Sequence, residues 1–235
     1  MSDGKRITRR KLLAGSGKAA AATAAASAIG WIEVGNPAAA ATAASPGEVG
    51  NVSAGRNSFE YIGRVDQDGD NLTSYGYLSA IARLRPGQLY TTSDPHDETT
   101  ARFTYYGTAT LFARNEFNGL FVIDARGSID YFFDPNGGAD FSDPASFKTG
   151  RLIGSDAARF HDVLSVTAPN TGIPHLTAAL RRTKARRFVL AGTTYRFGHL
   201  GLRQRSMATG LSNRTDPKPK SVLFLGGEVV VTDEG

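Results

Sequence analysis

Beyond residue 58, apolar and polar side chains alternate in short runs, and no stretch keeps a 3.6-residue apolar period for three turns. Alternation is the period of a β-strand, because successive side chains of a strand point to opposite faces. Gly, Asn, Asp and Pro separate the runs and favour turns. The candidate strands are 59–65, 72–84, 103–113, 120–133, 151–154, 160–167, 176–180, 188–197, 200–211 and 222–231. One helical turn is expected near 144–147.

Strands of this number and spacing are typical of an antiparallel barrel or a β-sandwich. In the run 160–167, Phe160, Asp162 and Leu164 share one face, while His161 and Val163 lie on the other. Such mixed faces favour a small closed barrel, whose interior holds side chains or one small ligand. We therefore predict an all-β fold, with a single antiparallel barrel of eight to ten strands over residues 59–235. The β-sandwich remains the alternative.

The segment before the strands has a different character. Arg9 and Arg10 stand in a basic stretch, and an Ala-rich, weakly hydrophobic region follows up to Ala44. This segment resembles a twin-arginine (Tat) export signal, with residues 1–43 removed at an Ala-x-Ala site. The resemblance implies the Tat translocase as a partner, no stable membrane span after cleavage, and an extracellular, cell-wall or periplasmic location. Residues 44–58, rich in Gly, Ser, Asn and Pro, are predicted to form a flexible linker.

Charge and cysteine content narrow the function classes. The chain carries a net charge of +5, but residues 1–43 contain six Lys or Arg and two Asp or Glu, which leaves +1 for the rest. A near-neutral mature chain argues against nucleic acid as a partner. The basic run 181–187 is interpreted as a solvated turn or exposed strand. Since the chain has no cysteine, thiolate chemistry and Cys-ligated metals are excluded.

Three segments of the predicted barrel carry a resemblance to a known family. Residues 127–133, 150–154 and 188–197 are similar to those of calycin-type barrels, and more narrowly of the allene oxide cyclase-like barrel shared with dirigent proteins. The resemblance implies an eight-stranded antiparallel barrel that acts on or around a small hydrophobic molecule in its interior. It carries over no catalytic residue to this chain.

Candidate site residues come from the aromatic and titratable positions of the predicted strands. The candidate ligand-binding residues are Tyr105, Tyr131, Tyr195 and Phe197. The candidate catalytic residues are His161, Asp162, Arg196 and His199. His161 and Asp162 lie on opposite faces of one strand, so these two side chains cannot form an acid–base pair with each other.

Asp66, Asp68 and Asp70 are spaced so that their carboxylates could converge on a hard cation such as Ca²⁺. An EF-hand loop would require Gly and Glu where this chain has Asn71 and Tyr77, so the motif fails. We therefore predict no metal and no cofactor, and interpret the loop as a polar hairpin turn.

The sequence thus predicts an exported β-barrel that binds a small hydrophobic molecule. The alternatives are a cofactor-free isomerase or cyclase that works in the barrel lumen, and a cell-surface structural domain without a pocket. The interior discriminates between them: Asp162, His161 or Arg196 clustered inside would favour an enzyme, and an apolar lumen would favour binding.

Overall fold

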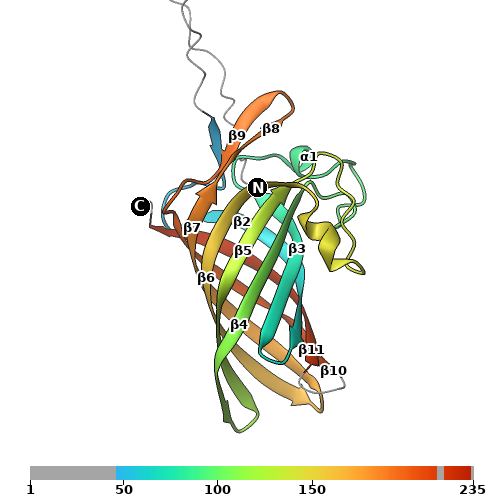
Figure 1. The fold of residues 1–235 in the computed structure, drawn as a ribbon, viewed down its shortest axis with the longest axis vertical. Helices are drawn as coiled ribbons and strands as arrows, with labels where there is room; N and C mark the ends of the chain where they lie inside the picture. Colours follow the sequence, from blue (N-terminus) through green and yellow to red (C-terminus); the bar gives the residue numbers. More distant parts are fainter. Residues whose placement is uncertain (1–45, 216–219, 234–235) are drawn as a thin grey trace, which may run out of the picture. The chain divides into compact units, whose positions relative to one another are not determined.

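The computed structural model describes residues 46–215 and 220–233, and eight of its strands close into an antiparallel barrel (Figure 1). The prediction of a single barrel is confirmed, and the sandwich alternative is wrong. The predicted signal at 1–43, with Arg9 and Arg10, lies outside the described residues. The barrel strands are β2 (Asn57–Asp68), β3 (Asn71–Ile81), β4 (Phe103–Phe117), β5 (Leu120–Phe133), β6 (Arg151–Ala168), β7 (Thr171–Ala185), β10 (Arg203–Thr215) and β11 (Lys220–Asp233).

The strand order is β10-β11-β2-β3-β4-β5-β6-β7, and pairing of β7 with β10 closes the barrel. The connections β2–β3, β4–β5 and β6–β7 share one end with Thr215 of β10 and Lys220 of β11, and we call it the hairpin end, drawn at the bottom of Figure 1. The turn between β4 and β5 is formed by Asn118 and Gly119, whose φ angles are 47° and 81°. Positive φ at both central residues matches the turn type that joins twisted antiparallel strands most readily.

A second, three-stranded sheet lies at the opposite end of the barrel (Figure 1). It consists of β1 (Gly47–Val49), β8 (Arg187–Leu190) and β9 (Thr193–Phe197), in the order β1-β9-β8. The helix α1 (Pro86–Leu89) lies in the β3–β4 connection. The one-turn helix predicted near 144–147 is confirmed as η1 (Pro144–Lys148). Within the described ranges, neither helix is long and apolar enough to cross a membrane.

The predicted linker at 44–58 is wrong for its described part, residues 46–58. Glu48 pairs in parallel with Arg196 of β9, and Val49 and Ser58 are buried. Composition alone indicated a linker, because Gly, Ser and Asn are typical of flexible segments. Here the segment gains a strand partner and packs Val49 into the core, which offsets the cost of ordering it.

Two strand boundaries also differ from the prediction. Residues 151–154 and 160–167 belong to one continuous strand, β6, and the residues between the two predicted runs include the buried polar Ser155 and Asp156. Conversely, 188–197 is a hairpin, because Ala191 and Gly192 adopt φ angles of 49° and 78° and reverse the chain between β8 and β9.

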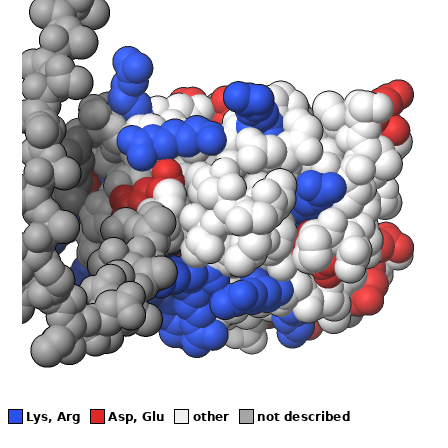
Figure 2. Space-filling view, turned by 90° about the horizontal axis from the view of Figure 1, so that it is seen from above, with Lys and Arg blue, Asp and Glu red and all other residues white. Residues whose placement is uncertain are grey.

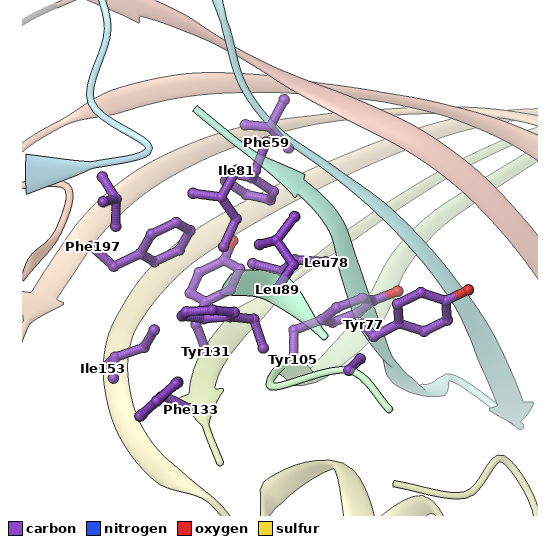
Figure 3. Close-up of a cluster of buried hydrophobic side chains, with 14 of the residues drawn as sticks. Phe59, Tyr77, Leu78, Ile81, Leu89, Tyr105, Tyr131, Phe133, Ile153 and Phe197 are labelled. Carbon is purple, nitrogen blue, oxygen red and sulfur yellow. The ribbon is translucent and has the colours of Figure 1, made fainter. Parts of the chain in front are cut away.

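Aromatic side chains fill the barrel at the end beside the three-stranded sheet (Figure 3). The ring of Tyr131 packs edge-on against Phe59 and Phe197, with centroids 5.5 and 5.1 Å apart. Phe133 and Phe188 continue the stack at 5.1 Å. Each such pair contributes about 0.5–1.5 kcal/mol beyond the area it buries. This aromatic plug closes one end of the barrel.

The outer surface has mixed charge. On the face shown in Figure 2, Lys and Arg side chains lie among Asp and Glu side chains, beside a broad area that carries neither. This mixture agrees with the near-neutral charge that the sequence leaves beyond residue 43.

Candidate functional site: the cavity at the hairpin end

A cavity of about 90 Å³ lies inside the barrel between the aromatic plug and the hairpin end. Most of its wall is apolar. The apolar side chains in this wall are Val65, Leu72, Ala109, Leu111, Ile123, Ala125, Phe160, Leu164, Leu176, Leu223 and Leu225. The polar residues are Gln67, Ser74, Thr108, Asp162, Ser212 and Ser221.

The cavity continues in both directions along the barrel. Toward the hairpin end it shares Ile123, Leu164 and Ser212 with a mouth of about 280 Å³. Toward the plug it shares Phe160 and Leu225 with a void of only about 30 Å³. The interior therefore widens from the plug to the mouth.

The sizes of the inward-facing residues explain this taper. Near the plug, the strands place Phe59, Tyr105 and Tyr131 inside the barrel. Nearer the hairpin end, Ala125 and Ser212 face inward. Small side chains cannot fill the width of an eight-stranded barrel, so space remains there.

Tyr105 fits inside only because two glycines face each other beneath it. Gly63 of β2 pairs with Gly76 of β3. A Cβ on Gly63 would lie 1.9 Å from the Tyr105 hydroxyl oxygen, and a Cβ on Gly76 would lie 2.9 Å from the Tyr105 ring. Real Cβ atoms do not approach other atoms so closely, so glycine at these positions makes room for the tyrosine.

Asp162 is the one titratable side chain among the described residues that line the cavity. The residue is 7% exposed, and its Oδ1 has no hydrogen-bond partner in the described structure. Burial raises the pKa of the Asp162 carboxyl to about 6, against the opposing effects of a backbone hydrogen bond from His175 and the charges of His175 and His161. Desolvation has this effect because it penalises the charged form of a carboxyl group.

Charged side chains of both signs surround the mouth. Arg114, Glu116, Arg214 and Lys220 line it. The Lys220 ammonium lies 3.5 Å from a carboxylate oxygen of Asp68. The guanidinium of Arg114 lies over the Phe121 ring, 4.6 Å from its centroid. The mouth therefore combines apolar surface with partly paired charges.

Of the four candidate catalytic residues, the structure brings only Asp162 to the cavity. His161 lies on the outer face of β6, and its Nδ1 is 3.1 Å from a carboxylate oxygen of Asp124. Arg196 lies on β9, where its guanidinium donates to Glu48. His199 follows β9, and its charge helps to lower the pKa of Glu48, after the larger effect of the hydrogen bond from Arg196.

Two of the four candidate ligand-binding aromatics lie inside the barrel, and the other two lie on β9. Tyr105 and Tyr131 line the small void next to the plug. Phe197 is part of the plug, and Tyr195 packs on Phe188 in the three-stranded sheet, with ring centroids 5.8 Å apart. None of the four lines the main cavity.

The three aspartates considered for a metal do not converge. Asp66 lies on the outer face, where it accepts hydrogen bonds from Arg64 and Tyr75, both at 2.7 Å. Asp68 pairs with Lys220. Neither these aspartates nor any other His, Asp and Glu side chains in residues 46–215 and 220–233 form a group of three suited to a metal ion.

Sequence reasoning missed a buried polar network beside the plug. Arg182, in the basic run interpreted as exposed, is 2% exposed and points into the barrel. Its Nε donates to Asp156 at 2.6 Å, and Asp156 also accepts from the Tyr131 hydroxyl at 2.8 Å. The guanidinium lies 4.6 Å from the Phe197 ring centroid and donates to the Phe197 carbonyl. Alternation from Leu180 would have placed Arg182 on the inner face.

This network joins the barrel to the three-stranded sheet and extends toward β1. Gln204 accepts from Arg182 at 3.5 Å and donates to the Ser58 hydroxyl at 2.7 Å. Ser58 in turn donates to the Gly50 carbonyl. Because its polar groups bond one another, the network has the character of a structural support.

Comparisons of the chain with protein-family models, with curated protein sequences and with solved structures found no match.

Proposed function

We propose that this protein is exported and binds a small hydrophobic molecule inside its barrel. The observation that carries the proposal is the apolar cavity, which continues into the wider mouth at the hairpin end. Ligand sites are typically concave, mostly apolar and equipped with a few polar groups that fix orientation. This cavity has that composition, with Asp162 as its one titratable group among the described lining residues.

The size of the cavity indicates the size of the ligand. An apolar protein cavity of roughly 150 Å³ accommodates a benzene ring. Here about 90 Å³ adjoins a mouth of about 280 Å³. A molecule with one ring or a short chain, entering from the hairpin end, fits this space.

Export is part of the proposal and is supported by the sequence. Arg9 and Arg10, the weakly hydrophobic stretch after them and the Ala-x-Ala sequence at 41–43 resemble a twin-arginine signal. That route carries folded proteins, and a barrel whose strands are joined mainly by hairpins between neighbours suits folding before export.

The arrangement favours binding over the cofactor-free isomerase or cyclase. Acid–base catalysis on one substrate typically pairs a general acid with a general base, and the surroundings of the two groups set their pKa values apart. Asp162 faces the cavity, while His161 and Arg196 have partners outside it. The pocketless structural domain is disfavoured by the cavity itself.

A nuclear magnetic resonance titration with methylcyclohexane tests the binding proposal. Ala125, which is buried and lines the cavity, is replaced by Leu to fill the space. Ala179, which is exposed on β7, is replaced by Leu as the matched control. We expect saturable shifts at cavity residues in the wild type and in Ala179→Leu, and weakened binding in Ala125→Leu. Equal responses of all three proteins would exclude the cavity as the binding site.

A further inference from the structure

The Asp162 carboxyl is buried in an apolar wall, and one of its oxygens has no partner among the described residues. An unpaired polar group in such a place costs free energy, and an unpaired charge costs far more. Native proteins seldom keep an unpaired buried polar group without a role. Because the Asp162 carboxyl faces a cavity, its position points to a ligand atom that supplies the missing hydrogen bond.

Chemistry narrows the group that this ligand atom belongs to. A carboxylate accepts hydrogen bonds and attracts positive charge. An anionic ligand would be repelled, and a hydroxyl would donate one hydrogen bond without neutralising the charge. A protonated amine donates a hydrogen bond to the carboxylate and also neutralises its charge. Such charge-assisted hydrogen bonds are shorter and about twice as strong as neutral ones.

We propose that the ligand of this cavity is a small apolar molecule with one protonated amine, and that the amine binds the Asp162 carboxylate. This inference rests on the proposed binding function and specifies the class of ligand. The apolar part of the molecule lies against Leu164 and Ile123, which line both the cavity and the mouth. Leu164 and Val166 separate Asp162 from the hairpin end along β6, so the amine enters first and the apolar part follows.

The charged surroundings agree with a cation at this position. The neighbouring charged side chains on β6 and β5, His161 and Asp124, face outward and pair with each other. On β7, His175 is exposed and opposes the rise in the Asp162 pKa. With a pKa of about 6, Asp162 is mostly ionised at neutral pH. A bound cation would lower this raised pKa and so favour the ionised form.

The basic side chains at the mouth do not oppose this assignment. Lys220 is paired with Asp68, and Arg114 lies over Phe121. Glu116 and Arg214 also line the mouth, with one negative and one positive charge. Solvent and salt screen the interactions of the charged groups at the mouth with a bound amine. Inside the largely apolar cavity, the interaction of the amine with Asp162 is screened much less.

A matched set of ligands tests the inference by calorimetry or by nuclear magnetic resonance titration. The four probes share a ring of one size: methylcyclohexane, cyclohexylmethanol, cyclohexylmethylamine and cyclohexanecarboxylate. At pH 7.5 we expect the amine to bind the wild-type protein about tenfold or more tightly than the alcohol, and the carboxylate to bind most weakly. The preference for the amine should shrink below about pH 6, as Asp162 becomes protonated.

Two variants locate the preference. Asp162→Asn removes the charge but keeps the shape, so the amine should lose its advantage while methylcyclohexane still binds. Asp124→Asn removes a carboxylate from the outer face of the neighbouring strand and should leave the preference intact. If methylcyclohexane binds but the amine gains nothing over the alcohol, the inference is wrong and the binding function stands. If none of the four probes binds, the proposed function itself fails.

Discussion

The Nε atom of Arg182 lies 2.6 Å from a carboxylate oxygen of Asp156, and both side chains are almost completely buried, at 1% and 0% exposure. The two residues come from the adjacent strands β7 and β6 at the end of the barrel that carries the aromatic plug. Through the Phe197 carbonyl, the same guanidinium holds β9 against the barrel. Arg182 therefore connects the two sheets of the protein.

Removal of Arg182 should strongly destabilise the fold. In Arg182→Met, Asp156 would keep its buried carboxylate without a cation, a defect that typically costs about 3–5 kcal/mol. Urea denaturation followed by circular dichroism measures this loss. Arg181→Met, at the exposed neighbouring position, is the control and should change the free energy of unfolding by no more than about 0.5 kcal/mol. Equal stability of the two variants would refute the structural role of Arg182.

The paired glycines beneath Tyr105 predict a second stability effect. In Gly63→Ala, the new Cβ would clash with the Tyr105 hydroxyl at 1.9 Å and with the Tyr75 carbonyl oxygen at 2.6 Å. Overpacking of this kind typically costs about 1–3 kcal/mol. Gly226→Ala on β11 is the control, because its Cβ would meet no atom within 4 Å. Thermal unfolding of the two variants should show a lower melting temperature only for Gly63→Ala.

The raised pKa of Asp162 predicts how stability depends on pH. The carboxyl titrates near pH 3.8 in the unfolded chain and near pH 6 in the folded protein, so between these values only the folded state keeps the proton. Stability therefore falls as the pH rises through this window, by about 3 kcal/mol from this group. Asp162→Asn has no carboxyl at this position and should lack this loss. The free energy of unfolding of the variant should therefore rise relative to that of the wild type from pH 4 to pH 7. Parallel stability curves for the two proteins would contradict the buried position of Asp162.

The proposed export signal predicts a cellular phenotype. With Arg9 and Arg10 both changed to Lys, the full-length precursor should accumulate inside the cell, because the paired arginines are the recognised feature of the twin-arginine route. Cell fractionation and immunoblotting measure the distribution of the protein. Arg6→Lys, outside the pair, should still be exported. Export of the Arg9 and Arg10 double variant at the wild-type level would remove the basis for the proposed location.

The barrel could be predicted from sequence because its strands alternate and its turns carry typical residues. The face of 160–167 that carries Phe160, Asp162 and Leu164 is the face that lines the cavity. The plug could not be predicted in the same way. The reversal at Ala191 and Gly192 folds 188–197 into a hairpin of the three-stranded sheet, so Tyr195 and Phe197 do not line the cavity.

The cavity and the buried ion pair depend on which strands become neighbours. Ala125 and Ser212 face the same space from β5 and β10, which are far apart in the chain. Arg182 was hidden in a basic run because most such runs are solvated, and its partner Asp156 lies 26 residues away. Alternation of apolar and polar residues indicates which side chains of a strand point inward. Only the closed sheet shows which side chains of other strands they contact.

The most direct measurement is native mass spectrometry of the protein purified from a host that exports it. We predict a chain that begins at Ala44 and carries a non-covalent component of small-molecule size, absent from Ala125→Leu and retained in Ala179→Leu. Denaturation should release this component for identification, and an amine in its structure would support the role of Asp162. The bare mass for wild type and variants alike, with nothing released on denaturation, would contradict a ligand-binding lumen.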